Sequence, residues 1–287
     1  MKLHYLGPEG SFSHEVALFK QAEDPSISLH KSGSWTEIAR NVHSNSGDLG
    51  LLVNYNLIDD HPQQALDVLH RFRLSIIETL RLPIVWYAGK SKYCCGDIET
   101  IYSHEKGLGQ TQSWITTSFP IAEQVPVAST SRAAELVSEQ KSGLAISSLD
   151  ALNSYGLDVI ASDIGDRLPA GQNYTDFYLV SSEIHESERI EGNDYSTRFV
   201  VRPRQNLAGT LAKIAVPLAE NNVDLVDFRS RKNPYSISNK NSPSLIFFGE
   251  ASAHYQDAHF VDACAQIRTQ VGDVYISGSP QVKVIRK

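Results

Sequence analysis

The sequence is poor in cysteine. Its 287 residues include 3 cysteines, of which Cys94 and Cys95 are adjacent and Cys264 lies far away. This spacing provides neither a disulfide framework nor a set of metal ligands. We therefore predict three free thiols, no metal site and no cofactor.

Long apolar runs and basic segments are also missing. No apolar stretch approaches the roughly 20 residues that span a bilayer, and the N-terminus lacks a signal-peptide pattern, so we expect a cytoplasmic protein without a membrane partner. The formal net charge is -7, and the basic cluster Arg229 to Lys232 is short, which argues against a nucleic-acid partner. An anionic substrate would need local donors, because the net field repels it.

What the chain does contain is a regular alternation of apolar segments. With 41% hydrophobic residues, the chain is long enough for two or three domains with a substantial core. Strand and helix patterns alternate over residues 1–182, which predicts an α/β fold. Residues 183–195 are polar and suit a linker. Residues 196–287 follow the order β-α-β-β-α-β, which is the ferredoxin-like arrangement.

The stretch Leu3 to Phe19 predicts a strand, a turn and a helix. Gly7-Pro8 and Gly10 break the strand, and Ser13 is a candidate helix cap. Such a turn leaves backbone N–H groups unpaired at the positive end of the helix dipole, beside the hydroxyl groups of Ser11 and Ser13. The turn can hold a carboxylate or phosphate, and the alternative is a capped helix without a ligand.

Three further polar elements follow predicted strands. Tyr55 and Asn56 come just after an apolar strand, where side chains commonly line the ligand crevice of an α/β sheet. Ser129, Thr130 and Ser131 precede a helix, so capping of that helix and hydrogen bonds to an anion are both open to them, and the two roles are compatible. A histidine, His104, begins another helix, and both a structural cap and a ligand contact remain open for it.

Several of these stretches, in the same order, resemble motifs of the prephenate dehydratase family. The matching residues are Gly7-Pro8 with Gly10-Ser11-Phe12-Ser13, Ser103-His104 with Leu108-Gly109-Gln110, Ser129-Thr130-Ser131, Ala145-Ile146-Ser147 and Tyr155-Gly156-Leu157. The last segment resembles an ACT regulatory domain, whose effector-site elements match Gly209 and Leu211 and also Ser230 and Arg231. The resemblance therefore spans nearly the whole chain.

The resemblance implies a fold and a substrate. Family members have a two-lobed catalytic region, similar to periplasmic binding proteins, in which both ends of the region build the first lobe; the second would span about residues 83–162. An ACT domain follows, and homodimers or homotetramers are usual. The implied substrate is prephenate. The implied site residues are Thr175 and Asn56 at the reacting ring, Ser11, Ser129, Thr130 and Ser131 at the pyruvyl carboxylate, and Phe12, Tyr55, Asp176 and Phe177 around the substrate.

Two departures from the family pattern bear on the reaction. The family has Thr-Arg-Phe where this chain has Thr175-Asp176-Phe177, and Glu-Asn-Ser where it has Tyr55-Asn56-Leu57. If Asp176 points into the cleft, its charge opposes the binding of a dianion. A second Thr-Arg-Phe, at Thr197 to Phe199, lies past the linker, and we interpret it as a chance match.

Three hypotheses for function follow. The leading hypothesis is a divergent family member that resembles the non-aromatising prephenate decarboxylases of antibiotic biosynthesis, which release carbon dioxide and keep the ring hydroxyl. The second is dehydration of prephenate to phenylpyruvate in phenylalanine biosynthesis. The third is a binding protein for a keto acid or amino acid without catalysis. The effector elements lack several family residues, so we expect weak or absent inhibition by phenylalanine.

Overall fold

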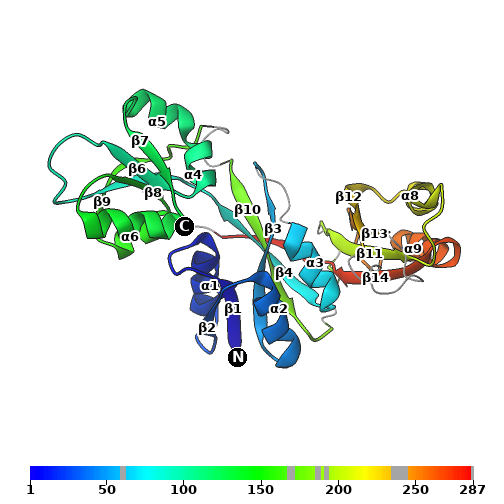
Figure 1. The fold of residues 1–287 in the computed structure, drawn as a ribbon. Coiled ribbons are helices and arrows are strands. Elements are labelled where there is room, and N and C mark those ends of the chain that lie inside the picture. Colours follow the sequence, from blue (N-terminus) through cyan, green and yellow to red (C-terminus); the bar gives the residue numbers. More distant parts are fainter. Residues whose placement is uncertain (59–62, 167–171, 185–188, 191–193, 234–244, 286–287) are drawn as a thin grey trace.

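The computed structural model describes residues 1–58, 63–166, 172–184, 189–190, 194–233 and 245–285. Within these residues the strands form three sheets. We call the units that contain them the first lobe, the second lobe and the ferredoxin-like domain. The first lobe lies between the other two units (Figure 1).

A six-stranded sheet forms the first lobe, in the order β15-β4-β10-β3-β1-β2. Its strands are β1 (Lys2–Leu6), β2 (Ser28–Ser32), β3 (Leu49–Asn56), β4 (Ser75–Pro83), β10 (Tyr174–Ser181) and β15 (Val282–Val284), and its helices are α1 (Phe12–Glu23), α2 (Trp35–Ser44) and α3 (Gln63–Arg71). Side chains alternate between the two faces of a strand. Leu51 therefore packs with the α1 residue Val16, whereas its neighbour Leu52 packs with Ile38 of α2.

The second lobe is a five-stranded sheet in the order β7-β6-β8-β5-β9. Its elements are β5 (Tyr87–Ser91), β6 (Thr100–Ser103), α4 (Glu105–Gln110), α5 (Gln112–Ser118), β7 (Glu123–Pro126), α6 (Thr130–Gln140), β8 (Leu144–Ser147), α7 (Leu149–Ser154) and β9 (Leu157–Ser162). The chain leaves the first lobe after β4 and returns to it in β10. This arrangement confirms the predicted two-lobed α/β region whose first lobe is built from both ends.

The ferredoxin-like domain contains β11 (Thr197–Pro203), α8 (Thr210–Glu220), β12 (Leu225–Lys232), β13 (Leu245–Ala251), α9 (Ala258–Gln270) and β14 (Gly272–Gly278). The sheet order is β12-β13-β11-β14, with antiparallel pairs, which confirms the predicted βαββαβ arrangement. The helices cover one face, where Phe199 packs against Ile214 and Phe260. The other face packs against the first lobe, where Val200 and Phe248 contact Leu66 of α3.

A fully buried arginine joins the ferredoxin-like domain to the first lobe. Arg198 of β11 is 1% exposed and donates hydrogen bonds to the hydroxyl oxygen of Tyr178 (3.1 Å) and to Oδ1 of Asn54 (3.2 Å). It also pairs with Asp227 (3.2 Å) and Glu250 of its own domain. The second Thr-Arg-Phe therefore lies outside the cleft between the lobes and holds two units together.

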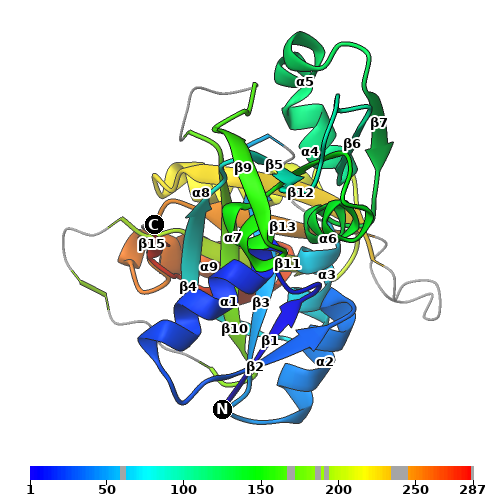
Figure 2. The ribbon, with the colours of Figure 1, turned by 90° about the vertical axis from the view of Figure 1, so that its left-hand side faces the viewer.

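The last strand departs from the predicted domain boundary. The sequence placed all of residues 196–287 in the ferredoxin-like domain, but β15 runs parallel to β4 in the first-lobe sheet, with Val282 opposite Thr79 (Figure 2). A three-residue edge strand carries too little pattern to be recognised from sequence. Ile285, just beyond it, is buried in the first-lobe core. None of the described helices combines the length and apolar character that crossing a bilayer requires.

Candidate active site

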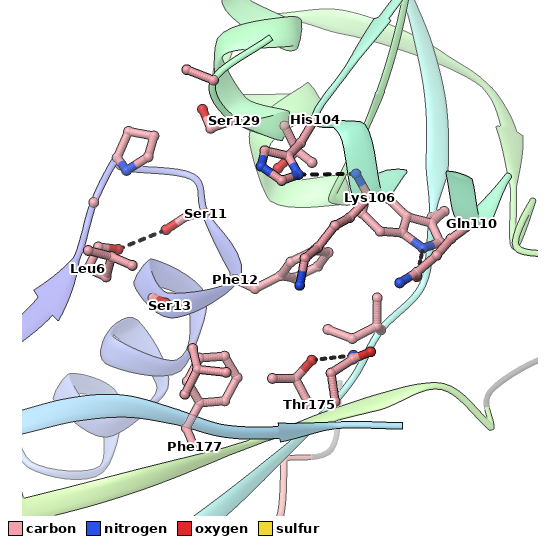
Figure 3. Close-up of a pocket in the computed structure, with 18 residues that line it drawn as sticks. Leu6, Ser11, Phe12, Ser13, His104, Lys106, Gln110, Ser129, Thr175 and Phe177 are labelled. Carbon is pink, nitrogen blue, oxygen red and sulfur yellow. Dashed lines mark hydrogen bonds between the residues drawn. The ribbon is translucent and has the colours of Figure 1, made fainter. Parts of the chain in front are cut away.

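A cavity of about 260 Å³ lies between the two lobes. Residues of the first lobe and of the second lobe both line it. The polar and aromatic lining residues are Ser11, Phe12, Ser13, Asn56, Trp86, His104, Lys106, Gln110, Ser129, Thr130, Thr175 and Phe177. His104 and Lys106 lie on one wall, whereas Thr175 and Phe177 lie on the opposite wall (Figure 3). Most of the predicted site residues are therefore brought to one place.

Thr175 and Asn56 face each other on the neighbouring strands β10 and β3. Nδ2 of Asn56 donates to Oγ1 of Thr175 (2.8 Å) and to the carbonyl oxygen of Tyr174 (3.1 Å), while its Oδ1 accepts from the backbone N–H of Ile58 (3.0 Å). These partners fix the orientation of the amide group. Because Thr175 accepts from Asn56, its own hydroxyl proton can be donated to a molecule in the cavity.

Asp176 does not line this cavity. Strand alternation directs Thr175 and Phe177 to one face of β10 and Asp176 to the other. The Asp176 carboxylate, 6% exposed, accepts from Nε (2.8 Å) and from a terminal nitrogen (2.9 Å) of Arg81. This contact raises the pKa of Arg81 above its ordinary value.

Tyr55, which is paired with Asp176 across β3 and β10, lies on the same side of the sheet. Both residues line a separate cavity between the first lobe and the ferredoxin-like domain, together with Asp227 and Arg229. Their placement corrects the expectation that Asp176 and Tyr55 contact a substrate beside Thr175. The physical reason is the two-residue period of an extended strand, which separates neighbours to opposite faces.

The glycine-containing turn after β1 supplies hydroxyl groups to the cavity, although its cap is not the predicted one. Ser11 rather than Ser13 caps α1: its Oγ accepts from the N–H of His14 (3.3 Å) and donates to the carbonyl of Leu6 (3.3 Å). The N–H of Gly10 donates to Nδ1 of His14 (2.9 Å). Some donors of the turn are thus used within it, while Ser11 and Ser13 still line the cavity.

The three hydroxyl residues before α6 have different positions. Ser129 caps α6 by accepting from the N–H of Arg132 (3.0 Å), and both Ser129 and Thr130 line the cavity. Ser131 is 1% exposed and lies against Gly10, where an added Cβ would come within 2.9 Å of the Ser131 Oγ. Ser131 therefore packs between the lobes and does not contact the cavity, contrary to the sequence-based expectation.

The start of α4 contributes a cation that the sequence reasoning missed. Lys106 lines the cavity, and its backbone N–H donates to Nδ1 of His104 (3.2 Å), so that His104 caps α4. The hydrogen of a neutral His104 ring is then on Nε2. His104 both caps the helix and lines the cavity, so a structural role and a ligand contact are compatible. Lys106 and Gln110 are four residues apart and so lie on one face of the helix. This spacing could have indicated that Lys106 faces the cavity together with Gln110.

A buried chain of amide groups connects the second lobe with Thr175. Oε1 of Gln110 accepts from Nε1 of Trp86 (2.9 Å) and from Nδ2 of Asn173 (3.1 Å). Oδ1 of Asn173 in turn lies 3.5 Å from Nδ2 of Asn56, the donor to Thr175. Trp86 and Asn173 belong to the segments that join the lobes. The network therefore fixes the position of one cavity wall relative to the other.

The predicted effector residues lie in the ferredoxin-like domain, away from this cavity. Gly209 is the N-cap residue of α8 and has a φ of 84°, and Leu211 is 53% exposed. Ser230 and Arg231 are neighbours on β12, and Arg231 pairs with Asp67 of α3 (2.7 Å). Among the residues placed by the structure, no three His, Cys, Asp or Glu side chains gather as metal ligands would.

The sequence profile described as prephenate dehydratase matches residues 3–185. This chain belongs to the prephenate dehydratase family. It is 24% identical over 281 residues to the bifunctional chorismate mutase/prephenate dehydratase of Aquifex aeolicus, covering 97% of this chain and 73% of that protein. It is 27% identical over 289 residues to the prephenate dehydratase of Mycolicibacterium vanbaalenii, covering 96% and 89% of the two chains.

Solved structures share the fold over the full chain. The prephenate dehydratase of Arthrobacter aurescens, crystallised with L-Phe, matches with a TM-score of 0.82 at 24% identity and covers 100% of this chain and 90% of that chain. A protein described as a quorum-quenching acylase matches with a TM-score of 0.81 at 20% identity and covers 99% and 98% of the chains. At these identities the likeness establishes the fold alone.

Proposed function

We propose that this protein is a prephenate dehydratase, which converts prephenate to phenylpyruvate, carbon dioxide and water. The observation that carries the proposal is the Thr175 hydroxyl, held in the cavity by a 2.8 Å hydrogen bond from Asn56. That bond occupies an acceptor site of the hydroxyl and leaves its proton to be donated. A positioned donor of this kind suits a reaction in which a hydroxyl group must depart.

The proposed reaction consumes one proton. Prephenate is a cyclohexadiene with a ring carboxylate, a pyruvyl side chain and a hydroxyl opposite them. Loss of the carboxylate as carbon dioxide sends the electron pair of its carbon–carbon bond into the ring, while the carbon–oxygen bond breaks and the hydroxyl leaves with a proton as water. The Thr175 hydroxyl donates a hydrogen bond to the departing oxygen, the proton that completes the water comes from solvent, and aromatisation of the ring supplies the driving force.

The opposite wall carries the groups that suit an anion. Lys106 provides a positive charge, and Ser129 and Thr130 provide hydroxyl groups at the start of α6, where the helix dipole also favours negative charge. A cation in a largely apolar cavity interacts with a carboxylate more strongly than it would in water. We assign the pyruvyl carboxylate to this wall. Phe12 and Phe177 then flank the ring.

The placement of Asp176 favours one of the two reactions of prephenate. Non-aromatising decarboxylation was favoured from the sequence because a reversed charge beside Thr175 was expected in the cleft. Asp176 instead pairs with Arg81 on the far face of β10. The cavity therefore keeps both Thr175 and Asn56 without an opposing carboxylate from Asp176, and this supports dehydration over decarboxylation.

Product analysis tests the proposal. Purified protein is incubated with prephenate at neutral pH, and phenylpyruvate, remaining prephenate and dihydro-hydroxyphenylpyruvate are quantified by liquid chromatography with mass detection. Phenylpyruvate formation above a sample without enzyme is expected. A dihydro-hydroxyphenylpyruvate product would establish the decarboxylase instead, and unchanged prephenate would favour a binding protein or a different substrate.

A further inference from the structure

Strand β3 contains a β-bulge near its C-terminal end. Tyr55 of β3 lies opposite Asp176 of β10, but the next pair along the two strands is Val53 with Phe177. Asn54 is therefore the extra residue at the point where the register shifts. Bulges of this kind redirect side chains and are common beside active sites.

The bulge determines which side of the sheet Asn56 faces. In a regular strand, side chains alternate between the two faces, so Val53 and Asn56, three residues apart, would point to opposite faces. Both residues instead line the cavity between the lobes, while Asn54 and Tyr55 both line the cavity next to the ferredoxin-like domain. A slip of one residue moves every following side chain to the other face. Without the bulge, Asn56 would therefore face away from Thr175.

The ferredoxin-like domain contacts the bulge through Arg198. A terminal nitrogen of Arg198 donates a hydrogen bond to Oδ1 of Asn54 (3.2 Å), and the two residues are 1% and 5% exposed. A hydrogen bond between groups so deeply buried is costly to break, because solvent does not readily replace it. This contact therefore opposes a shift of Asn54 along the strand.

The guanidinium group of Arg198 is itself fixed by its other partners. It pairs with Asp227 (3.2 Å) and Glu250 of its own domain, and its Nε donates to the hydroxyl oxygen of Tyr178 (3.1 Å). Because a guanidinium is planar and rigid, contacts at all three of its nitrogens determine where each N–H group points. The position of the donor to Asn54 is thus set by the ferredoxin-like domain.

We propose that Arg198 is a positioning residue for the reaction in the cavity between the lobes. Arg198 holds Asn54 in the bulge of β3 and thereby directs Asn56 toward Thr175. This role rests on the proposed function, in which the Thr175 hydroxyl donates to the departing oxygen. The ferredoxin-like domain contributes to the catalytic geometry in this way although none of its described residues lines the cavity.

Kinetics of one variant and its matched control test the proposal. Asn54→Ala removes the acceptor that Arg198 contacts. It should lower kcat for prephenate about 10-fold to 100-fold with little change in KM, because the groups that act on the transition state are displaced while the groups that bind the carboxylate are not. The control, Tyr178→Phe, removes another hydrogen bond of the same arginine on the far side of the bulge from Asn56, and it should keep the wild-type kcat. Equal kcat values for the two variants would overturn the proposal.

A double-mutant cycle tests whether Arg198 acts through Asn54. Arg198→Lys keeps a positive charge beside Asp227 and Glu250 but lacks the planar fork of the guanidinium. It should lower kcat at least about 10-fold in the wild type and change kcat little in the Asn54→Ala background, because both substitutions remove one contact. The same further loss in both backgrounds would show that Arg198 acts independently of Asn54 and would overturn the proposal. The comparison of Asn54→Ala with Tyr178→Phe does not depend on whether Arg198→Lys folds.

Crystal structures of the wild type and of Asn54→Ala separate this role from the proposed function. Nδ2 of Asn56 lies 2.8 Å from Oγ1 of Thr175. In the variant, this contact should lengthen beyond hydrogen-bonding distance, and an unchanged contact would overturn the positioning role. A wild type that forms no phenylpyruvate would refute the proposed function, whereas the position of Asn56 in the two structures would still decide the role of Arg198.

Discussion

Asp176 and Arg81 form a two-pronged ion pair across the neighbouring strands β10 and β4, with both hydrogen bonds shorter than 3 Å. The guanidinium also lies over the Tyr174 ring, 3.8 Å from its centroid. This pair lies on the opposite face of the sheet from Thr175. Asp176, which replaces the arginine of the family pattern, therefore has its charge neutralised by Arg81 next to the ferredoxin-like domain and does not face a substrate.

Replacing Thr175 by alanine should lower kcat about 10²-fold or more, because the variant cannot donate a hydrogen bond to the departing oxygen. Thr175→Ser keeps the hydroxyl and should retain much of the activity. Thr117→Ala, on an exposed face of α5, is the matched control. Steady-state kinetics with prephenate measure the effect. Equal activity of Thr175→Ala and the control would contradict the assigned role.

Replacing Lys106 by methionine should raise KM for prephenate about 10-fold to 100-fold, because a charge-assisted contact with the carboxylate is lost. The change in kcat should be smaller, since the carboxylate carries its charge in both the bound substrate and the transition state. Lys106→Arg should recover part of the affinity. Lys213→Met, on the exposed side of α8, is the control and should leave KM unchanged.

Introducing arginine at position 176 should not increase phenylpyruvate formation. Asp176→Arg places two guanidinium groups together where an ion pair was largely buried, and we expect a loss of about 3 kcal/mol in the free energy of unfolding. The swapped double variant, Arg81→Asp with Asp176→Arg, should recover much of this loss. Urea unfolding measures both variants. A gain in activity from Asp176→Arg alone would show that position 176 reaches the cavity after all.

Stability should fall as the pH drops below the ordinary histidine pKa of 6.5. Burial lowers the pKa of both His14 and His70 in the folded protein. Between 6.5 and the lower folded value, the unfolded chain binds protons that the folded chain does not, so acid favours unfolding. His70→Gln cannot bind a proton and should show a shallower loss between about pH 6.5 and pH 5. Urea unfolding at several pH values measures the slope, and an unchanged slope would exclude His70 as a contributor.

Addition of L-phenylalanine should have little effect on activity. The segments around Gly209 and Arg231, where the resemblance to the family implies an effector site, lack several residues of the family pattern, and Arg231 is already paired with Asp67. Initial rates with prephenate and the Tm should both change little when L-phenylalanine is added. Strong and specific inhibition, absent with D-phenylalanine, would disprove this expectation.

Local pattern was enough to predict the fold class of each part of the chain. The alternating segments of residues 1–182 predicted an α/β fold, and the order of elements after the linker predicted the ferredoxin-like domain. The division of residues 1–182 into two lobes was implied by the resemblance to the family. Ser11, Asn56, Ser129 and Thr175 were expected at the site and all line one cavity. The fold prediction succeeded because it depends on short stretches whose period and order are visible in the sequence, whereas a substrate contact of these four residues stays a prediction.

The remaining features depend on which way side chains point and on contacts between distant segments. The contact of Asp176 with Arg81 joins residues 95 positions apart, and Arg198 reaches Asn54 across 144 positions. Contacts between residues so far apart in the sequence cannot be predicted from local sequence patterns. Lys106 was not predicted because it stands at a position that the family motif leaves unspecified.

The return of β15 to the sheet of the first lobe changes how the polypeptide can be cut. In topological terms the ferredoxin-like domain is an insertion between β10 and β15, because the chain departs from that sheet and comes back to it. Shortening the C-terminus would strip an edge strand from β4 before it harmed the inserted domain. Isolating the inserted domain takes two cuts, whereas removing it from the two lobes takes two cuts and a new connection between β10 and β15. An affinity tag is better attached at the N-terminus.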